Sequence, residues 1–264
     1  MANVSVLGAG SWGLGLALLL NNNGHNVTVW SVLKDEVAML QTEREHKRCL
    51  PGVKIPDSIT VSGDTENVIG SADVLVLAVA SPYTRSTAKM IAPFVKEGQI
   101  IVNVAKGVEE HTLLTLCQIV EEEIPCAKVA VLSGPSHAEE VSRGIPTTCV
   151  IGAHEKATAE YLQNIFMSDV FSVYTSPYML GICIGGALKN VIALAAGIAD
   201  GLGYGDNTKA ALITRGNAEI TRLGVAMGAN PHTFAGLSGI GDLIVTCASM
   251  HSRNTVSYTH LTLP

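Results

Sequence analysis

Short apolar runs alternate with helix-forming stretches over the first two-thirds of the chain. The runs occupy residues 3–7, 26–30, 73–79, 99–104, 128–132, 147–151 and 170–174. Residues 73–79 (DVLVLAV) are almost wholly apolar, which is typical of a strand buried on both faces of a parallel sheet. The stretches 14–20, 83–95, 112–123 and 155–166 predict the intervening helices. The pattern therefore predicts an α/β domain with a mostly parallel sheet.

The pattern changes after Pro177, where the strand signal ceases apart from the last ten residues. A long apolar stretch at 179–199 and a second helical stretch at 208–227 follow, and the glycine-rich segment 236–242 predicts a flexible loop. We expect two domains, with residues 1–176 forming the sheet domain and residues 177–264 forming an all-α domain.

The apolar stretch 179–199 (MLGICIGGALKNVIALAAGIA) contains a single charge, Lys189. A membrane span is disfavoured, because a lysine at its centre costs roughly 2.5 to 3.5 kcal/mol and four glycines interrupt the run. A buried helix fits better, and burial would lower the pKa of the lysine unless a carboxylate pairs with it. Lys189 is then a candidate proton donor. The alternative is a lysine whose ammonium reaches solvent beside a packed helix.

A glycine motif, Gly8-Ala9-Gly10-Ser11-Trp12-Gly13, separates the first strand from the first helix. In this context Gly8 permits a tight turn, Gly10 lets a pyrophosphate approach the backbone, and Gly13 lets helix and strand pack closely. The motif predicts a Rossmann-type dinucleotide-binding domain. A glycine-rich turn in an unrelated α/β fold is the alternative.

The end of the second strand bears on the choice of cofactor. An acidic residue there would bind the ribose hydroxyl of NAD, but the chain has Ser31, followed by Val32, Leu33 and Lys34. This favours NADP, with Ser31 and Lys34 near a 2′-phosphate, although Lys34 is also a simple exposed residue at a helix start. The nearby Asp35 and Glu36 leave both NAD and NADP open.

Two further strand ends carry polar groups. Lys106 follows the strand at 99–104, where ligands of parallel sheets bind, unless it is an ordinary loop lysine. Ser133 to Glu140 (SGPSHAEE) places Gly134 and Ser136 before a helix. That arrangement suits either an anion or a plain helix cap. The three glutamates at 121–123 are most simply a solvated helix face.

Composition narrows the class of protein. Hydrophobic residues make up 47% of the 264 residues and charged residues 15%, which predicts a large core. A net charge of −6 argues against nucleic acid as a partner. Six scattered cysteines without metal spacing indicate reduced thiols and no metal site, and the N-terminus shows no leader pattern, so we expect a cytoplasmic protein.

With these segments in order, the chain resembles the NAD(P)-dependent glycerol-3-phosphate dehydrogenases, more closely the bacterial type. The matching stretches lie within residues 3–254 and are GAGSWG, LPGVKIP, AKGVE, SGPSHAEEV, GALKNVIALAAGIADGLGYGDNTKAALITRG, LSGIGDLIVTC and SRN. The resemblance implies reduction of dihydroxyacetone phosphate to sn-glycerol 3-phosphate for glycerophospholipid synthesis, with NAD or NADP as cofactor and no metal.

The resemblance also implies roles for individual residues. Lys189 would be catalytic and would exchange a proton with the C2 oxygen, with Asp242 beside it. The implied substrate contacts are Lys106, Gly134, Ser136, Lys189, Asp242, Ser252, Arg253 and Asn254. The implied cofactor contacts, added to Gly8, Gly10 and Gly13, are Ser11, Trp12, Lys106, Ala138 and Arg253.

The sequence departs from the family pattern in three places. His137 replaces an aromatic residue, and Val32 and Leu33 stand where Arg or His is common. Residues 255–264 are β-prone where the family is helical, so we expect a truncated or foreign end and an incomplete substrate domain. Two alternatives remain at this stage, a related hydroxyacid or 6-phosphogluconate-type dehydrogenase and a cofactor-binding remnant without turnover. Monomer and homodimer are both open.

Overall fold

An eight-stranded sheet fills the first part of the computed structural model, which describes residues 1–248. Its strands run in the order β3-β2-β1-β4-β5-β6-β7-β8. The bounds are β1 Asn3–Leu7, β2 Asn26–Trp30, β3 Thr60–Ser62, β4 Val74–Leu77, β5 Ile100–Asn103, β6 Lys128–Ser133, β7 Thr147–Ala153 and β8 Phe171–Ser176. The pairs from β3 to β6 are parallel, β7 is antiparallel to β6, and β8 is parallel to β7. The reversal at β7 was not predicted.

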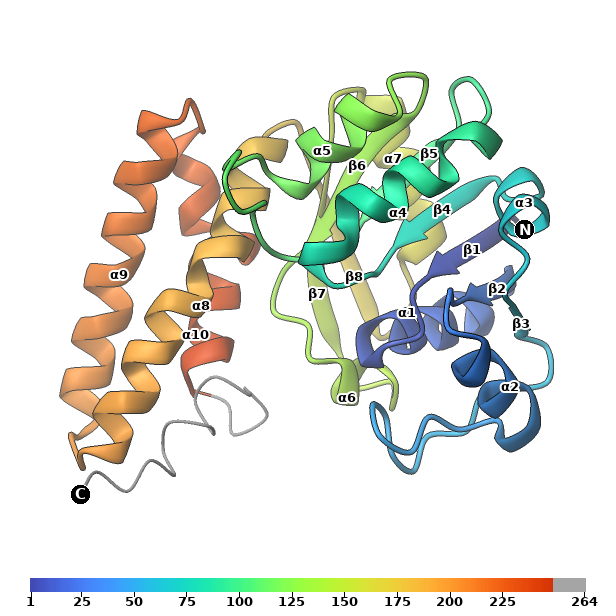
Figure 1. The fold of residues 1–264 in the computed structure, drawn as a ribbon. Coiled ribbons are helices and arrows are strands. Elements are labelled where there is room, and N and C mark those ends of the chain that lie inside the picture. Colours follow the sequence, from blue (N-terminus) through green and yellow to red (C-terminus); the bar gives the residue numbers. More distant parts are fainter. Residues whose placement is uncertain (249–264) are drawn as a thin grey trace.

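Helices cover both faces of this sheet (Figure 1). They are α1 Ser11–Asn22, α2 Lys34–Glu43, α3 Thr65–Gly70, α4 Thr84–Ile91, α5 Leu116–Glu123, α6 Ala138–Val141 and α7 Lys156–Phe166, with short turns η1 Ser81–Tyr83 and η2 Ala92–Phe94. Parallel strands with crossover helices on both faces form a doubly wound Rossmann-type fold, so the predicted fold class of this part is confirmed.

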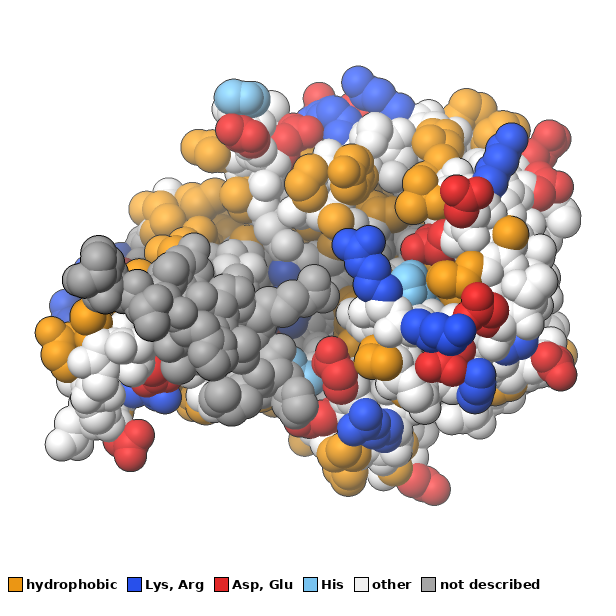
Figure 2. All heavy atoms as spheres, turned by 60° about the horizontal axis from the view of Figure 1, so that its bottom comes forward, with side chains coloured by type: hydrophobic (Ala, Val, Ile, Leu, Met, Phe, Trp, Pro, Cys, Tyr) orange, Lys and Arg blue, Asp and Glu red, His pale blue; other side chains and the backbone are white. Residues whose placement is uncertain are grey.

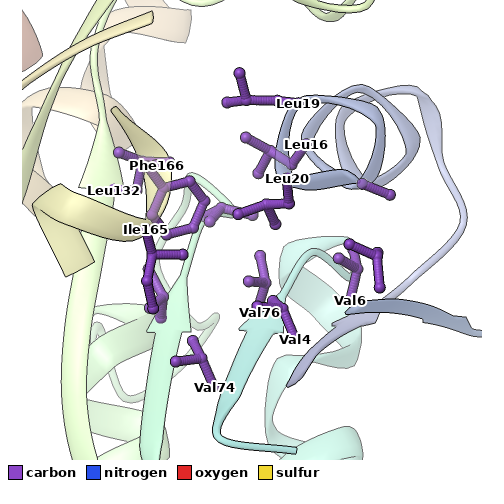
Figure 3. Close-up of a cluster of buried hydrophobic side chains, with 14 of the residues drawn as sticks. Val4, Val6, Leu16, Leu19, Leu20, Val74, Val76, Leu132, Ile165 and Phe166 are labelled. Atoms are coloured by element: carbon purple, nitrogen blue, oxygen red, sulfur yellow. The ribbon is translucent and has the colours of Figure 1, made fainter. Parts of the chain in front are cut away.

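The core of the sheet part is built by strand alternation. Val74 and Val76 of β4 point to one face, while Leu75 and Leu77 point to the other. On the first face the leucines of α1 lie against the valines of β1 and β4, with Phe166 of α7 beside them (Figure 3). This packing holds α1, and with it the glycine turn at its start, against the middle of the sheet.

The second part is helical, as predicted. It comprises α8 Met179–Gly201, α9 Asp206–Ala226, the turns η3 Pro231–Ala235 and η4 Leu237–Gly241, and α10 Asp242–Ala248. Helices α8, α9 and α10 pack side by side beyond the β7–β8 end of the sheet (Figure 1). The predicted boundary at residues 176 and 177 falls between β8 and α8, and we propose it as the boundary between two domains.

Helix α8 is the apolar stretch singled out in the sequence. By length and composition it could cross a membrane, with a mean hydropathy of 1.8 over 18 residues, but half of that window is buried inside the fold. Its Ile184, Ala193 and Ala196 share a core cluster with Phe234 and Leu243. Burial on this scale is what a central helix of a globular domain requires.

The prediction of a flexible loop at residues 236–242 is wrong. Residues 237–241 form one turn of π-helix, η4, and Asp242 begins α10. Glycines there serve close packing rather than flexibility, since a Cβ on Gly239 would fall 2.3 Å from the carbonyl oxygen of Phe234. Asp242 is only 1% exposed.

The glutamates at 121–123 are partly solvated, with Glu122 56% exposed, and they also form ion pairs. Arg85 of α4 donates to the carboxylates of Glu122 and Glu123, and Glu121 accepts from His154. Arg85 also binds Glu109 through two hydrogen bonds of 2.7 Å. These pairs tie α4 and α5 to the loop that follows β5.

Helix α5 begins four residues later than predicted. Thr115 caps it by accepting from the backbone of Gln118, whose side chain in turn accepts from the Thr115 backbone. His111 and Leu113 have positive φ angles, which a helix does not tolerate.

Charged side chains of both signs are interspersed over the sheet part, on the face drawn in Figure 2. No continuous basic area appears on that face.

Candidate functional site

Lys189 and Asp242 meet in a buried pair between two helices of the second part. Lys189 lies in the middle of α8 and is 8% exposed, and Asp242 is the first residue of α10. The Lys189 Nζ donates to Asp242 Oδ1 at 2.5 Å and to Thr246 Oγ1 at 2.8 Å. The side chain is therefore held inside the fold and does not reach out to solvent.

Lys106 reaches the same carboxylate from the sheet part. It follows β5 by three residues, and its Nζ donates to Asp242 Oδ2 at 2.6 Å and to the carbonyl oxygen of Gly134 at 3.1 Å. Ser136 donates its hydroxyl to the same Gly134 carbonyl at 3.0 Å. The structure thus brings together Lys106, Gly134, Ser136, Lys189 and Asp242, which are five of the eight predicted substrate contacts.

The electrostatics of this cluster favour an anionic ligand. Two lysines face one aspartate, so these three side chains carry a net charge of +1. Burial is the main cause that lowers the pKa of Lys189, and the positive charge of Lys106 lowers it further. Asp242 raises the pKa, and the net result is a pKa of about 8. An ammonium with a pKa near 8 can give up or regain a proton close to neutral pH.

Two residues of the cluster were missed by the sequence analysis. Thr246 accepts from Lys189 and donates to the carbonyl oxygen of Asp242 at 2.6 Å, one helical turn away. Once 242–248 is seen as a helix, the i, i+4 spacing of Asp242 and Thr246 places both on one face. The hydroxyl of Ser133 is buried without a hydrogen bond among the described residues and lies where a Cβ on Gly186 would come within 3.1 Å. No sequence signal marks Ser133.

The glycine turn after β1 has the shape that a dinucleotide needs. Gly8 has φ of +118°, and a Cβ there would fall 2.8 Å from the carbonyl oxygen of Ala78. A Cβ on Gly13 would fall 2.0 Å from the Gly8 carbonyl oxygen, whereas a Cβ on Gly10 would meet nothing within 4 Å. Gly10 therefore presents open backbone, and α1 starts at Ser11 without a side-chain cap. The free amides at that helix start fit a pyrophosphate.

Trp12 and Ala138 lie around the same helix. The indole nitrogen of Trp12 donates to the carbonyl oxygen of Val104 at 3.2 Å, which links α1 to the end of β5. Ala138 starts α6 and stands 3.4 Å from the position of a Cβ on Gly15. Trp12 is thereby linked to the segment that leads to Lys106, and Ala138 packs against α1.

The predicted role of Ser31 beside a 2′-phosphate conflicts with its contacts. Ser31 is 6% exposed, and its hydroxyl donates to the carboxylate of Glu36. Lys34 is exposed at the first position of α2.

Three predicted contacts, Ser252, Arg253 and Asn254, lie outside the described residues, as does the predicted foreign end at 255–264. Within residues 1–248, no group of three or more His, Cys, Asp or Glu side chains is arranged to hold a metal ion.

Comparison with known proteins agrees with this geometry. Residues 3–159 match the family model of the NAD-dependent glycerol-3-phosphate dehydrogenase N-terminus, and residues 179–260 match that of the C-terminus. A glycerol-3-phosphate dehydrogenase [NAD(P)+] from Agathobacter rectalis is 64% identical over 254 residues, which are 96% of this chain and 76% of the relative. One from Fusobacterium nucleatum is 60% identical over 256 residues, again 96% and 76%.

A solved structure supports the same assignment. The crystal structure of glycerol-3-phosphate dehydrogenase from Coxiella burnetii superposes with a TM-score of 0.94 at 33% identity, covering 98% of this chain and 79% of the other. Matches to both family models and identities of 60% or more exclude membership of a merely related dehydrogenase group. The chain therefore belongs to the NAD-dependent glycerol-3-phosphate dehydrogenase family.

Proposed function

We propose that this chain reduces dihydroxyacetone phosphate to sn-glycerol 3-phosphate with NADH or NADPH, and that the product feeds glycerophospholipid synthesis in the cytoplasm. The observation that carries the proposal is the buried Lys189, with a pKa lowered to about 8 and a carboxylate beside it, at the junction of the two parts of the chain. A carbonyl reduction requires such a proton donor beside a dinucleotide crevice.

Lys189 supplies the proton of the reaction. The nicotinamide cofactor supplies a hydride to C2 of the substrate, and the C2 oxygen, as it gains negative charge, takes a proton from the Lys189 ammonium. Two of the three N–H groups of Lys189 are used by Asp242 and Thr246 among the described residues, which leaves the third for this oxygen. Asp242 and Thr246 hold the ammonium in place and keep it oriented.

Lys106 binds the substrate phosphate or its neighbouring hydroxyl. Its ammonium already lies 2.6 Å from Asp242 and contributes the excess positive charge of the cluster. Gly134 and Ser136 border the same space, and Ser252, Arg253 and Asn254 complete the phosphate site. The anion is thereby drawn into a site whose net charge opposes its own.

The cofactor lies along the glycine turn. Gly8, Gly10 and Gly13 shape the turn, the amides at Ser11 receive the pyrophosphate, and Trp12 and Ala138 contact the nucleotide on either side. In this proposal Lys106 and Arg253 contact both the cofactor and the substrate.

The test is oxidation of NADH and NADPH by the purified chain in the presence of dihydroxyacetone phosphate, followed at 340 nm. We expect turnover that falls at least about 100-fold in Lys189→Ala. Lys128→Ala is the matched control, because Lys128 pairs with Glu155 on the surface at 2.6 Å. It should retain the native rate.

Two results would overturn the proposal. Equal turnover in Lys189→Ala would remove the proton-donor role. Saturable nucleotide binding without turnover would instead identify a cofactor-binding chain with an incomplete substrate site.

A further inference from the structure

A carboxylate lies at the end of β2, next to the glycine turn. Trp30 ends β2 and pairs in register with Leu7, and its carbonyl oxygen accepts from the backbone of Gly8 at 2.9 Å. The residues after Trp30 are therefore direct neighbours of the glycine turn. In doubly wound folds the side chains at this strand end meet the adenosine ribose.

The hydroxyl of Ser31 has no hydrogen left to donate to a ligand at the end of β2. Its hydroxyl gives its proton to Glu36 Oε2 and accepts from the backbone of Leu33 at 3.1 Å. The carboxylate that contacts Ser31 is Glu36, which lies in the first turn of α2 and is 19% exposed.

His46 holds the other oxygen of the same carboxylate. Its Nε2 lies 3.2 Å from Glu36 Oε1, and its Nδ1 accepts from the backbone of Cys49 at 3.3 Å. Because Nδ1 is an acceptor, the proton of the neutral ring is on Nε2 and points to Glu36. Both oxygens of Glu36 thus accept hydrogen bonds, which fix the orientation of the carboxylate.

The two residues that follow Ser31 carry no positive charge that could compensate for a second negative charge. Val32 and Leu33 are both 59% exposed and apolar. Three cations of the following segment are engaged elsewhere: Arg44 with the carbonyl oxygens of Ile55 and Ile59, Lys47 with Glu43, and Lys54 with Glu45. Lys34 and Arg48 are exposed.

We propose that Glu36, fixed by Ser31 and His46, selects NADH over NADPH by accepting hydrogen bonds from the adenosine ribose hydroxyls and repelling a 2′-phosphate. The inference rests on the proposed use of a nicotinamide cofactor and names the residue that chooses between its two forms. Like charges held together at a binding site cost enough free energy to change affinity by tenfold or more.

Direct binding of NADH and NADPH to the full chain, measured by isothermal titration calorimetry, tests the proposal without requiring turnover. We expect NADH to bind at least about tenfold more tightly than NADPH, with the ratio of affinities reduced about tenfold or more in Glu36→Gln. Glutamine keeps the size and one acceptor oxygen but removes the charge.

Asp35→Asn is the matched control. Asp35 is the preceding residue of the same helix and is exposed, so the variant removes one charge from the same turn without touching the Ser31 and His46 contacts. It should leave the ratio within about twofold of the native value. A ratio that falls equally in Asp35→Asn would show a general charge effect and overturn the role of Glu36.

The outcomes separate the two proposals. Native binding of NADPH as tight as that of NADH, or an unchanged ratio in Glu36→Gln, overturns this inference and leaves the proposed reaction intact. Failure of both nucleotides to bind overturns the proposed function and this inference with it. A folded Ser31→Ala variant provides a second check. Loss of the Ser31 contact frees Glu36 and should reduce the ratio of NADH affinity to NADPH affinity, as in Glu36→Gln.

Discussion

At the scale of single residues, opposing electrostatic effects act on the charge of Lys189. Burial and the neighbouring Lys106 disfavour its charge, while Asp242 favours it, and the balance lowers its pKa from 10.5 to about 8. The sequence marks Lys189 as unusual because it is the one charge in 21 apolar or small residues. Local patterns do not identify its partners, since Asp242 lies 53 residues away and Lys106 belongs to the other part of the chain; the family resemblance did imply that Asp242 lies beside it.

This shift makes stability depend on pH. Between about pH 8 and 10.5 the unfolded chain binds more protons at Lys189 than the folded chain does, so the free energy of unfolding rises with pH over this range. The 2.5-unit difference in pKa corresponds to about 3 kcal/mol. This rise should be absent in Lys189→Met, which lacks the titrating amine. Asp242 keeps Lys106 as its partner in that variant.

Urea unfolding of native and Lys189→Met chains at pH 7 and pH 10.5 measures the effect. The unfolding free energy of the native chain minus that of Lys189→Met should increase by about 3 kcal/mol from pH 7 to pH 10.5. A difference that stays constant between the two pH values would mean that Lys189 is not desolvated as described.

At the scale of elements, the site depends on how closely α8 approaches η4 and α10. A Cβ on Gly185 would fall 2.6 Å from the carbonyl oxygen of Ser238, so only glycine permits this approach. The sequence predicts α8 well, because its composition is strongly apolar over several turns. It fails for 236–242, where glycines suggested a loop but in fact allow backbone contact with α8. The i, i+4 relation of Asp242 and Thr246 was hidden by that error.

Gly185→Ala should therefore loosen the site. Overpacking of this kind costs about 1 to 3 kcal/mol of unfolding free energy, and displacement of η4 would move Asp242 away from Lys189 and lower kcat. Gly70→Ala is the control, because Gly70 ends a helix and a Cβ there meets nothing within 4 Å. Thermal unfolding and steady-state rates should change in the first variant and stay near native in the second. An unaffected Gly185→Ala would show that α8 and η4 can separate without cost.

At the scale of the whole molecule, the catalytic cluster joins the two parts of the chain. Asp242 of the helical part binds Lys189 of α8 and Lys106 from the sheet part, so one carboxylate links both. Most strands and helices along the chain, and the glycine turn after β1, could be predicted, because each rests on a local pattern. Local patterns did not predict the antiparallel pairing of β7 with β6. Nor did they predict the hydrogen bond between Lys106 and Asp242, which are 136 residues apart, although the family resemblance named both as substrate contacts.

The most direct test of the account is the pH dependence of kcat/KM for dihydroxyacetone phosphate reduction. Because Lys189 must carry a proton to reduce the substrate and has a pKa of about 8 in the free protein, kcat/KM should fall as the pH rises through about 8. The reverse reaction, which needs the neutral lysine, should rise over the same range. A profile for reduction that stays flat from pH 7 to 10, with native activity, would contradict the assignment of Lys189 as the proton donor.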